Sequence, residues 1–155
     1  MHGANKLKPI AERVARDELE LTLAENLGKL KFKVLTERLA VCRAAAGSPA
    51  PSWALEGIFF CVARTSDELS IVCPESQVKT DTQIAVESGW IALKLEGPFP
   101  FSMTGVLSSF LQPLAEARVP IFAVSTFDTD YVLVKEHDLP RALSALRSAG
   151  HELAG

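Results

Sequence analysis

The residue types that most often carry catalytic or metal chemistry are few in this sequence and lie far apart. The three histidines, His2, His137 and His151, are not near one another or near a cysteine at a metal-ligand spacing. Ser108 and Ser109 lie in a predicted helix without a base in view, and neither a G-x-S-x-G motif nor a glycine-rich phosphate loop is present. We therefore predict a protein that is not an enzyme, with no metal and no cofactor.

The cysteines also argue against a reactive site. Cys42, Cys61 and Cys73 are odd in number, form no C-x-x-C pair and each lie inside an apolar segment. This pattern indicates small buried side chains in strands rather than a zinc or redox motif.

Two loops have residue types that suit a small ligand. The first, GPFPFSMTG (97–105), joins a predicted strand to a predicted helix, whose free N–H groups would suit a carboxylate; the alternative is a stiff connector capped by Ser102. The second, STFDTDYV (125–132), places Asp128 and Asp130 where they could face a cation; the alternative is a hairpin turn whose Asp and Thr side chains bond locally.

These loops need a framework, which the second half of the chain predicts clearly. A strand over 89–97 leads into the first loop, and strands over 120–126 and 131–135 flank the second. Between them Ser102 or Thr104 is expected to cap a helix that Pro113 bends or restarts. A final helix begins at Asp138 and ends near Gly150. The apolar face of the first helix is Met103, Val106, Leu107, Phe110, Leu111 and Leu114.

The first half shows the same strands with weaker helices. Strands are predicted over 31–35, 39–44, 58–64 and 69–73, with one more short strand over 84–88. Between them lie a loop over 44–52 and at most one helical turn over 53–57. Residues 1–28 have mixed periodicity, and a short helix over 9–18 is the only element predicted there.

The two hairpins align without gaps at an offset of 62, and the preceding strands also align, 39–43 with 90–94. We therefore predict an α+β fold of two tandem ferredoxin-like (βαββαβ) units, with antiparallel sheets and helices on one face. The first unit has reduced helices, so the N-terminal extension or a second chain is expected to cover its sheet. The aligned apolar residues are Phe60, Val62, Leu69, Ile71 and Val72 with Phe122, Val124, Tyr131, Leu133 and Val134.

Composition narrows the possible partners. The 155 residues have a net charge of −3, so there is no basic surface for nucleic acid. No apolar run approaches the ~20 residues of a membrane helix, and the N-terminus lacks a signal-peptide core. We expect a cytoplasmic protein that binds neither nucleic acid nor membranes.

Three segments together resemble the small bacterial tandem ACT-domain proteins, and through them the regulatory domain of aspartate kinase and the cytosolic arginine sensor of animals. They are LEGPFPFSMTGVLSSFLQPLAEA, IFAVSTFDTDYVLV and RTSDELSIVCPE. The resemblance covers Lys31 to Gly150 and implies amino-acid binding or sensing in a regulatory role. It divides the chain into an N-terminal extension (1–30), a first ACT-like unit (31–88) and a second ACT unit (89–155).

The resemblance also implies a ligand site where the first loop meets the second. Helix N-terminal amides near 104–106 would hold an α-carboxylate, carbonyls near 125–127 an α-amino group, and Asp130 or Asp128 the side chain. The arginine sensor uses an acidic residue in its first loop, whereas this loop has Met103 or a neighbour there. The candidate ligand-binding residues are Gly97, Pro98, Phe101, Ser102, Met103, Thr104, Gly105, Val106, Ser125, Thr126, Phe127, Asp128 and Asp130.

A different function fits the same fold. The protein could dock a partner protein through a sheet edge or helix face without any ligand. In either case an open sheet edge favours pairing with another chain, so we expect a homodimer.

Overall fold

Short apolar runs separated by turn residues form eight strands, two α-helices and three 3-10 turns within the residues that the computed structural model describes, which are 13, 28–79 and 83–155. The helix predicted over 9–18 lies outside the described residues, apart from position 13. In chain order the elements are β1 (Lys31–Val34), β2 (Leu39–Ala44), η1 (Ser52–Leu55), β3 (Cys61–Arg64), β4 (Leu69–Pro74), η2 (Glu75–Gln77), β5 (Ala85–Leu95), α2 (Val106–Glu116), β6 (Ile121–Ser125), β7 (Asp130–Lys135), η3 (Glu136–Asp138), α3 (Leu139–Ser148) and β8 (Glu152–Leu153).

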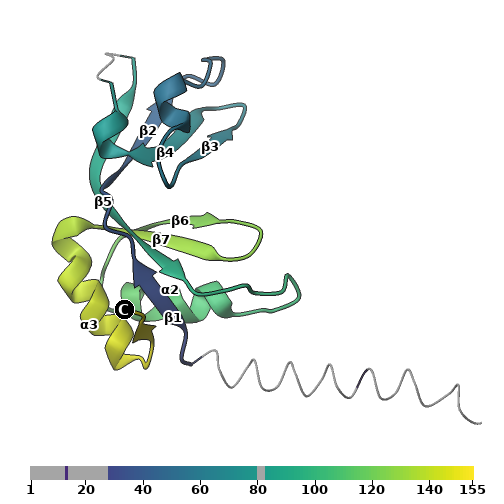
Figure 1. Ribbon diagram of the computed structural model, residues 1–155, viewed down its shortest axis with the longest axis vertical. Coiled ribbons are helices and arrows are strands. Elements are labelled where there is room, and N and C mark those ends of the chain that lie inside the picture. The colour runs from purple at the N-terminus through teal and green to yellow at the C-terminus, as the bar shows by residue number, and fades with distance from the viewer. Residues whose placement is uncertain (1–12, 14–27, 80–82) are drawn as a thin grey trace, which may run out of the picture.

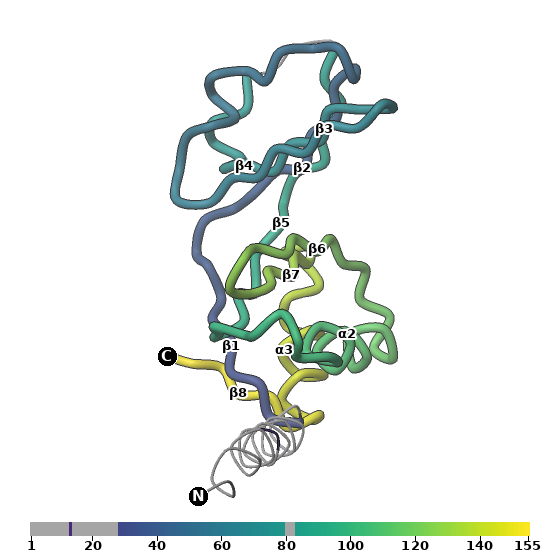
Figure 2. The backbone as a smooth tube through the Cα atoms, turned by 90° about the vertical axis from the view of Figure 1, so that its right-hand side faces the viewer, coloured from purple at the N-terminus to yellow at the C-terminus, as the bar shows by residue number. Residues whose placement is uncertain are grey.

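The strands form one sheet that serves two units, one above the other in Figure 1. The first unit contains β3, β4, β2 and the start of β5, in that spatial order. The second contains β8, β1, the end of β5, β7 and β6, together with α2 and α3. Figure 2 shows that two segments connect the units, the run from β1 to β2 and the strand β5.

The strand β5 runs through both units, which corrects the prediction of separate strands over 84–88 and 89–97. Its pairing with β2 shifts register between Leu39, opposite Trp90, and Val41, opposite Glu87. Gly89 lies in this irregularity with a φ of 76°, a conformation that side chains rarely adopt. Gly89 therefore accommodates a bulge within one continuous strand.

The strand β1 lies in the sheet of the second unit although it precedes the first hairpin in the sequence. It is antiparallel to β5 and parallel to β8. The sheet is therefore mixed, whereas the sequence predicted antiparallel sheets. The predicted boundaries 1–30, 31–88 and 89–155 stay a prediction.

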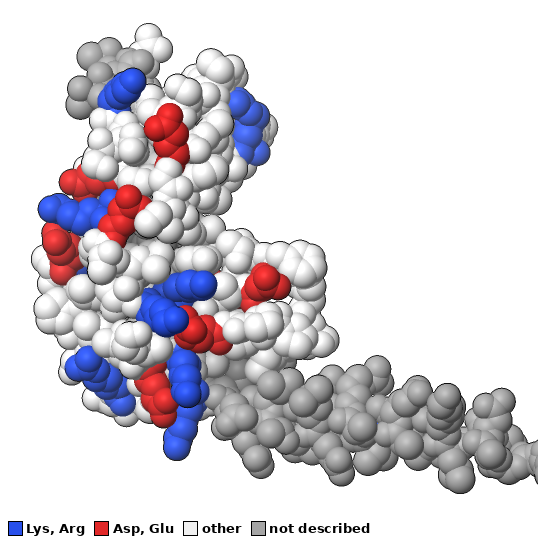
Figure 3. All heavy atoms as spheres, in the orientation of Figure 1, with Lys and Arg blue, Asp and Glu red and all other residues white. Residues whose placement is uncertain are grey.

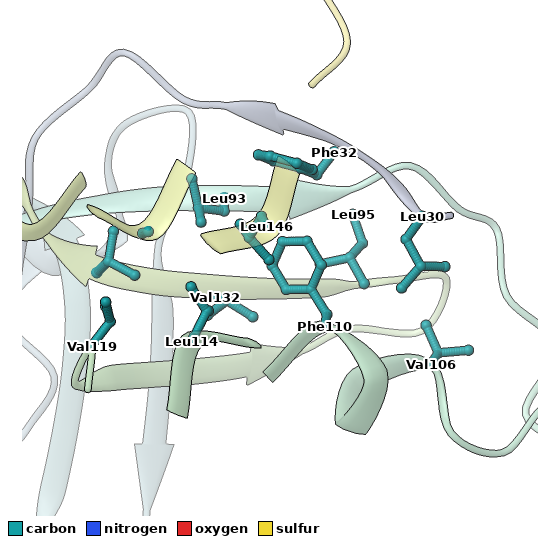
Figure 4. Packing of buried hydrophobic residues seen from close by; sticks show 12 residues of the cluster. Leu30, Phe32, Leu93, Leu95, Val106, Phe110, Leu114, Val119, Val132 and Leu146 are labelled. Carbon is teal, nitrogen blue, oxygen red and sulfur yellow. The ribbon is translucent and has the colours of Figure 1, made fainter. Parts of the chain in front are cut away.

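Both helices cover one face of the second unit's sheet and form its core with it. Phe110 from α2 stands edge-on to Phe32 from β1, with 5.3 Å between ring centroids, and both are fully buried. Figure 4 shows Phe110 and Leu146 side by side against this face. This core fixes the position of α2, and with it the loop that leads into the helix.

The 3-10 turn η1 covers part of the first unit's sheet, and the expectation that the N-terminal extension or a second chain covers it stays a prediction. Trp53 and Ala54 from η1 are buried and pack on a cluster that includes Ile71. Cys42 and Cys73 are buried free thiols in the same cluster, as the sequence indicated, whereas Cys61 is a free thiol that is only half-buried. A hydrogen bond between them lowers the pKa of the Cys42 thiol and raises that of Cys73.

The two hairpins correspond at an offset of 61, so the offset of 62 is wrong by one residue. Each closes a four-residue turn in which Thr65 or Thr126 donates its backbone N–H to the fourth residue's carbonyl, at 2.9 and 2.8 Å. At 61, Val72 matches Leu133, and both lie in one buried cluster between the units. At 62, Val72 would match Val134, which faces the helices. A slip of one residue changes the face of every side chain.

Candidate functional site

The two predicted loops lie next to each other and line one pocket of about 320 Å³. The pocket lies where the loop between β5 and α2 meets the turn between β6 and β7. In Figure 1 these two segments lie on the same side of the second unit. The lining residues are Phe99, Pro100, Phe101, Met103, Gly105, Val106, Leu107, Ser108, Ser125, Thr126, Phe127, Asp128, Thr129 and Asp130.

Three contacts join these loops. The Phe99 N–H donates to the Asp128 carbonyl at 2.8 Å, and the Thr129 hydroxyl donates to the Leu95 carbonyl at 2.7 Å. Gly97 approaches so closely that an added Cβ would lie 2.6 Å from the Asp128 carbonyl oxygen. A residue with a side chain would therefore separate the two loops, which explains the glycine at this position.

The start of α2 faces the pocket without a side-chain cap. The N-cap residue is Gly105, with a φ of 87°, so the prediction of Ser102 or Thr104 as the cap is wrong. The first turn of a helix has N–H groups without intrahelical partners and carries partial positive charge. Because Gly105 has no side chain to accept from them, these groups are available to an anionic ligand.

The turn between β6 and β7 carries two acidic residues with different surroundings. Asp130 is half-buried, and one of its oxygens accepts a very short hydrogen bond from the Ser125 hydroxyl. Asp128 is exposed, and its backbone carbonyl holds the neighbouring loop. The Thr126 hydroxyl donates to the Thr129 carbonyl at 2.8 Å, so local bonds order this turn, as the alternative interpretation anticipated.

Two exposed aromatic rings stand at the rim of the pocket. Phe101 and Phe127 are 77% and 78% exposed, and their centroids are 4.9 Å apart in an edge-to-face arrangement. One comes from each loop. The pair therefore places apolar surface next to the acidic turn and the helix terminus.

Nine of the thirteen predicted residues line this pocket. Gly97 and Pro98 line a neighbouring pocket of about 270 Å³ together with Lys94, Glu96, Asp128 and Thr129. Ser102 and Thr104 line neither pocket. The prediction missed Phe99, Pro100, Leu107, Ser108 and Thr129, which lie inside or directly beside the motifs that pointed to the site.

Behind the pocket, α2 is braced by His151, which is buried. The Leu30 N–H donates to His151 Nδ1 at 3.2 Å, so Nε2 carries the proton and donates to the Ser109 carbonyl at 3.3 Å. That carbonyl has no helical donor because Pro113 lacks an N–H, and the helix nevertheless continues through Pro113. Burial lowers the pKa of His151, while the bond to Ser109 acts in the opposite direction.

Two further types of site were sought. Among residues 28–79 and 83–155, no group of three or more His, Cys, Asp or Glu side chains is placed to hold a metal ion. Within the same part of the chain, no helix has the length and apolar character to cross a membrane.

Comparison with known proteins links both halves of the chain to described families. Residues 85–148 match the family model of the ACT domain, which includes β5, both helices and the pocket. Residues 37–81 match a second family model, which describes an N-terminal domain.

Three relatives illustrate the similarity. Protein Atu0741 from Agrobacterium tumefaciens is 39% identical with a TM-score of 0.75, over 81% of this chain and 92% of that one. The human cytosolic arginine sensor for mTORC1 subunit 1 is 31% identical over 72% of this chain and 35% of its own length. The aspartate kinase regulatory subunit from Thermus thermophilus has the same fold at 10% identity, with a TM-score of 0.54 over 75% of this chain and 96% of that one.

The chain spans between 30% and 62% of the length of the curated relatives that it matches.

Proposed function

The chain belongs to the ACT-domain proteins and is related to the cytosolic arginine sensors and to the regulatory ACT domains of aspartate kinase, and from this we propose that it is a non-enzymatic regulatory protein whose pocket of about 320 Å³ binds a free amino acid. The observation that carries the proposal is the meeting of an uncapped helix terminus and two carboxylates in that pocket.

The start of α2 suits the α-carboxylate of the ligand. The Gly105 cap leaves the first-turn amides without a side-chain acceptor, and Val106 and Leu107 line the pocket beside it. A carboxylate placed there would accept hydrogen bonds from these amides and would also be favoured by the helix dipole.

The turn between β6 and β7 suits the positive end of the ligand. Main-chain carbonyls of 125–127 would accept from the α-ammonium group, and Asp130 or Asp128 would contact the side chain. Met103 is half-buried in the pocket and would pack against the ligand's apolar part. The loop 97–105 has no acidic residue, so recognition of a cationic side chain would rest on these two aspartates.

A thermal-shift panel tests the proposal. Each of the twenty amino acids is added at millimolar concentration, and we expect at least one to raise the Tm. A ligand at one hundred times its Kd stabilises the folded state by about 2.7 kcal/mol, which is a rise of roughly 5–10 °C for a chain of this size. The same panel on Ser108→Asp, which places a negative charge at an exposed position in the first turn of α2, should show no shift. A flat panel with the wild-type chain refutes the proposal.

The exposed pair Phe101 and Phe127 favours a second candidate, a module that docks a partner protein without a ligand. Exposed neighbouring aromatics are frequent at protein interfaces. A flat amino-acid panel, combined with partner capture that is lost in Phe101→Ser and Phe127→Ser, would support this candidate.

A further inference from the structure

We propose a second ligand site at the joint between the two units, where the half-buried Glu37 takes the ammonium head of a small alkylamine. Glu37 lies in the segment 35–38, which carries the chain from β1 in the second unit to β2 in the first. This site is remote in sequence from the pocket of loops 97–105 and 125–132, and it does not depend on what binds there.

The first observation is a carboxylate without a partner. Glu37 Oε2 is buried, and no described residue forms a hydrogen bond or ion pair with either oxygen of this side chain. Taking a carboxylate out of water without a partner is costly, so buried carboxylates are normally paired. A cation that reaches Glu37 would remove this cost, and no described side chain does so.

The second observation is space on both sides of this carboxylate. Glu37 and Thr36 line an apolar pocket of about 80 Å³ together with Leu35, Leu39, Ile58 and Phe59. They also line a wider pocket of about 410 Å³ with Arg38, Glu75 and Ser76. Glu37 therefore lines both spaces.

The charge around the joint favours a cation. Arg38 is already occupied, because its guanidinium lies 3.6 Å from Glu75 and 3.4 Å from Glu136. The formal charges of Glu37, Arg38, Glu75 and Glu136 sum to −2. Figure 3 shows acidic and basic groups side by side at the narrowing between the two units. A cation entering here would therefore meet a net attractive field.

Size and lining then define the chemical class. A space of 80 Å³ holds about two or three water-sized groups, which excludes a whole amino acid from the narrow pocket but admits an ammonium group on a short alkyl stem. Ile58 is 93% exposed, so an alkyl stem can pack on its side chain. Such a ligand would contact 35–38 and 58–59 together and would stiffen the joint between the units.

The test is a titration of the full-length chain with n-propylammonium chloride, followed by backbone amide NMR shifts. We expect saturable shifts at 35–39 and 58–59, none with sodium chloride or with neutral propan-1-ol, and a Kd at least about tenfold weaker in Glu37→Gln. The matched variant Glu116→Gln, on α2, should bind as the wild type does. Because the shifts are mapped by residue, failure here is distinguishable from failure of the amino-acid pocket.

Other outcomes overturn the proposal. No saturable shift at 35–39, or equal affinity in Glu37→Gln, means that the space holds water only. A lower Tm for ligand-free Glu37→Gln would show that the carboxylate has a partner, whereas an unpaired one predicts an equal or higher Tm. Dissociation of an oligomer by propylammonium, seen as a falling sedimentation mass, would assign the site to a second copy of the chain.

Discussion

Replacing His151 should change how the stability of the protein depends on pH. In the folded state its pKa lies below 6.5 because the ring is buried, whereas in the unfolded chain the ring is solvated. Between these two pKa values the unfolded state binds more protons, so the free energy of unfolding falls as pH drops below about 6.5. One proton limits this loss to about 1.4 kcal/mol per pH unit.

The two hydrogen bonds of the His151 ring determine which two substitutions are informative. His151→Asn keeps an acceptor near the Leu30 N–H, and His151→Gln keeps a donor near the Ser109 carbonyl, which Pro113 leaves without its helical partner. Each variant leaves one of these backbone groups unsatisfied, at a cost of about 1–3 kcal/mol at pH 7.5, or roughly 2–12 °C in Tm. Neither side chain titrates.

The assay is urea unfolding between pH 5 and 8 for the wild type, both variants and His137→Gln. His137 has a side chain that is 79% exposed, so it serves as the matched control. We expect the wild type and His137→Gln to lose stability in parallel below pH 6.5 and both His151 variants to lose less. Parallel curves for all four chains would refute the argument that burial of His151 creates this dependence.

Three further predictions, two on substitutions and one on the mass of the unchanged chain, test the pocket and the assembly. Gly97→Ala should destabilise the fold by about 1–3 kcal/mol in urea unfolding, because its Cβ would lie 2.6 Å from a carbonyl oxygen, while Gly47→Ala, with open space around it, should change it by less than about 0.5 kcal/mol. Asp130→Asn should weaken the binding of a cationic amino acid found in the panel by about tenfold to a hundredfold in calorimetry, whereas Asp67→Asn, in the corresponding turn of the first unit, should not. Equal affinities would show that Asp130 only stabilises the turn. The outer strands β3 and β6 each pair on one side only within the described residues, so we expect sedimentation at twice 16.8 kDa, and a single-chain mass at tens of micromolar would contradict the homodimer.

Much of the site could be predicted from residue types because its signals are local. Two loops are predicted from local residue types, the glycines and prolines of 97–105 and the Asp and Thr residues of 125–132. The 3.6-residue period of apolar residues predicts α2 between them. Because connections between consecutive elements are short, the loop before α2 and the turn between β6 and β7 are expected to lie close together. The pocket follows from these elements.

Other features depend on atoms that a local pattern does not reveal. A strand pattern of period two fits either face, so the alignment of the hairpins slipped by one residue. The strands predicted over 84–88 and 89–97 are one strand, because the glycine at their junction, Gly89, lies in a bulge, and a local pattern does not distinguish a bulge from a break. The role of His151 could not be predicted, because its partners are backbone atoms 121 and 42 positions away and no side-chain motif marks them.

The position of β1 has a consequence for how the chain folds during its synthesis. The register pairs Lys31 with Glu152 and Phe32 with Leu153, so β1 meets one of its two neighbours only after residues 152 and 153 have been synthesised. The first unit needs nothing beyond the start of β5 and can close earlier. A nascent chain therefore carries a finished β-rich unit beside an unfinished helical one. A chain truncated before β8 leaves an edge of β1 unpaired in the unit that contains the pocket.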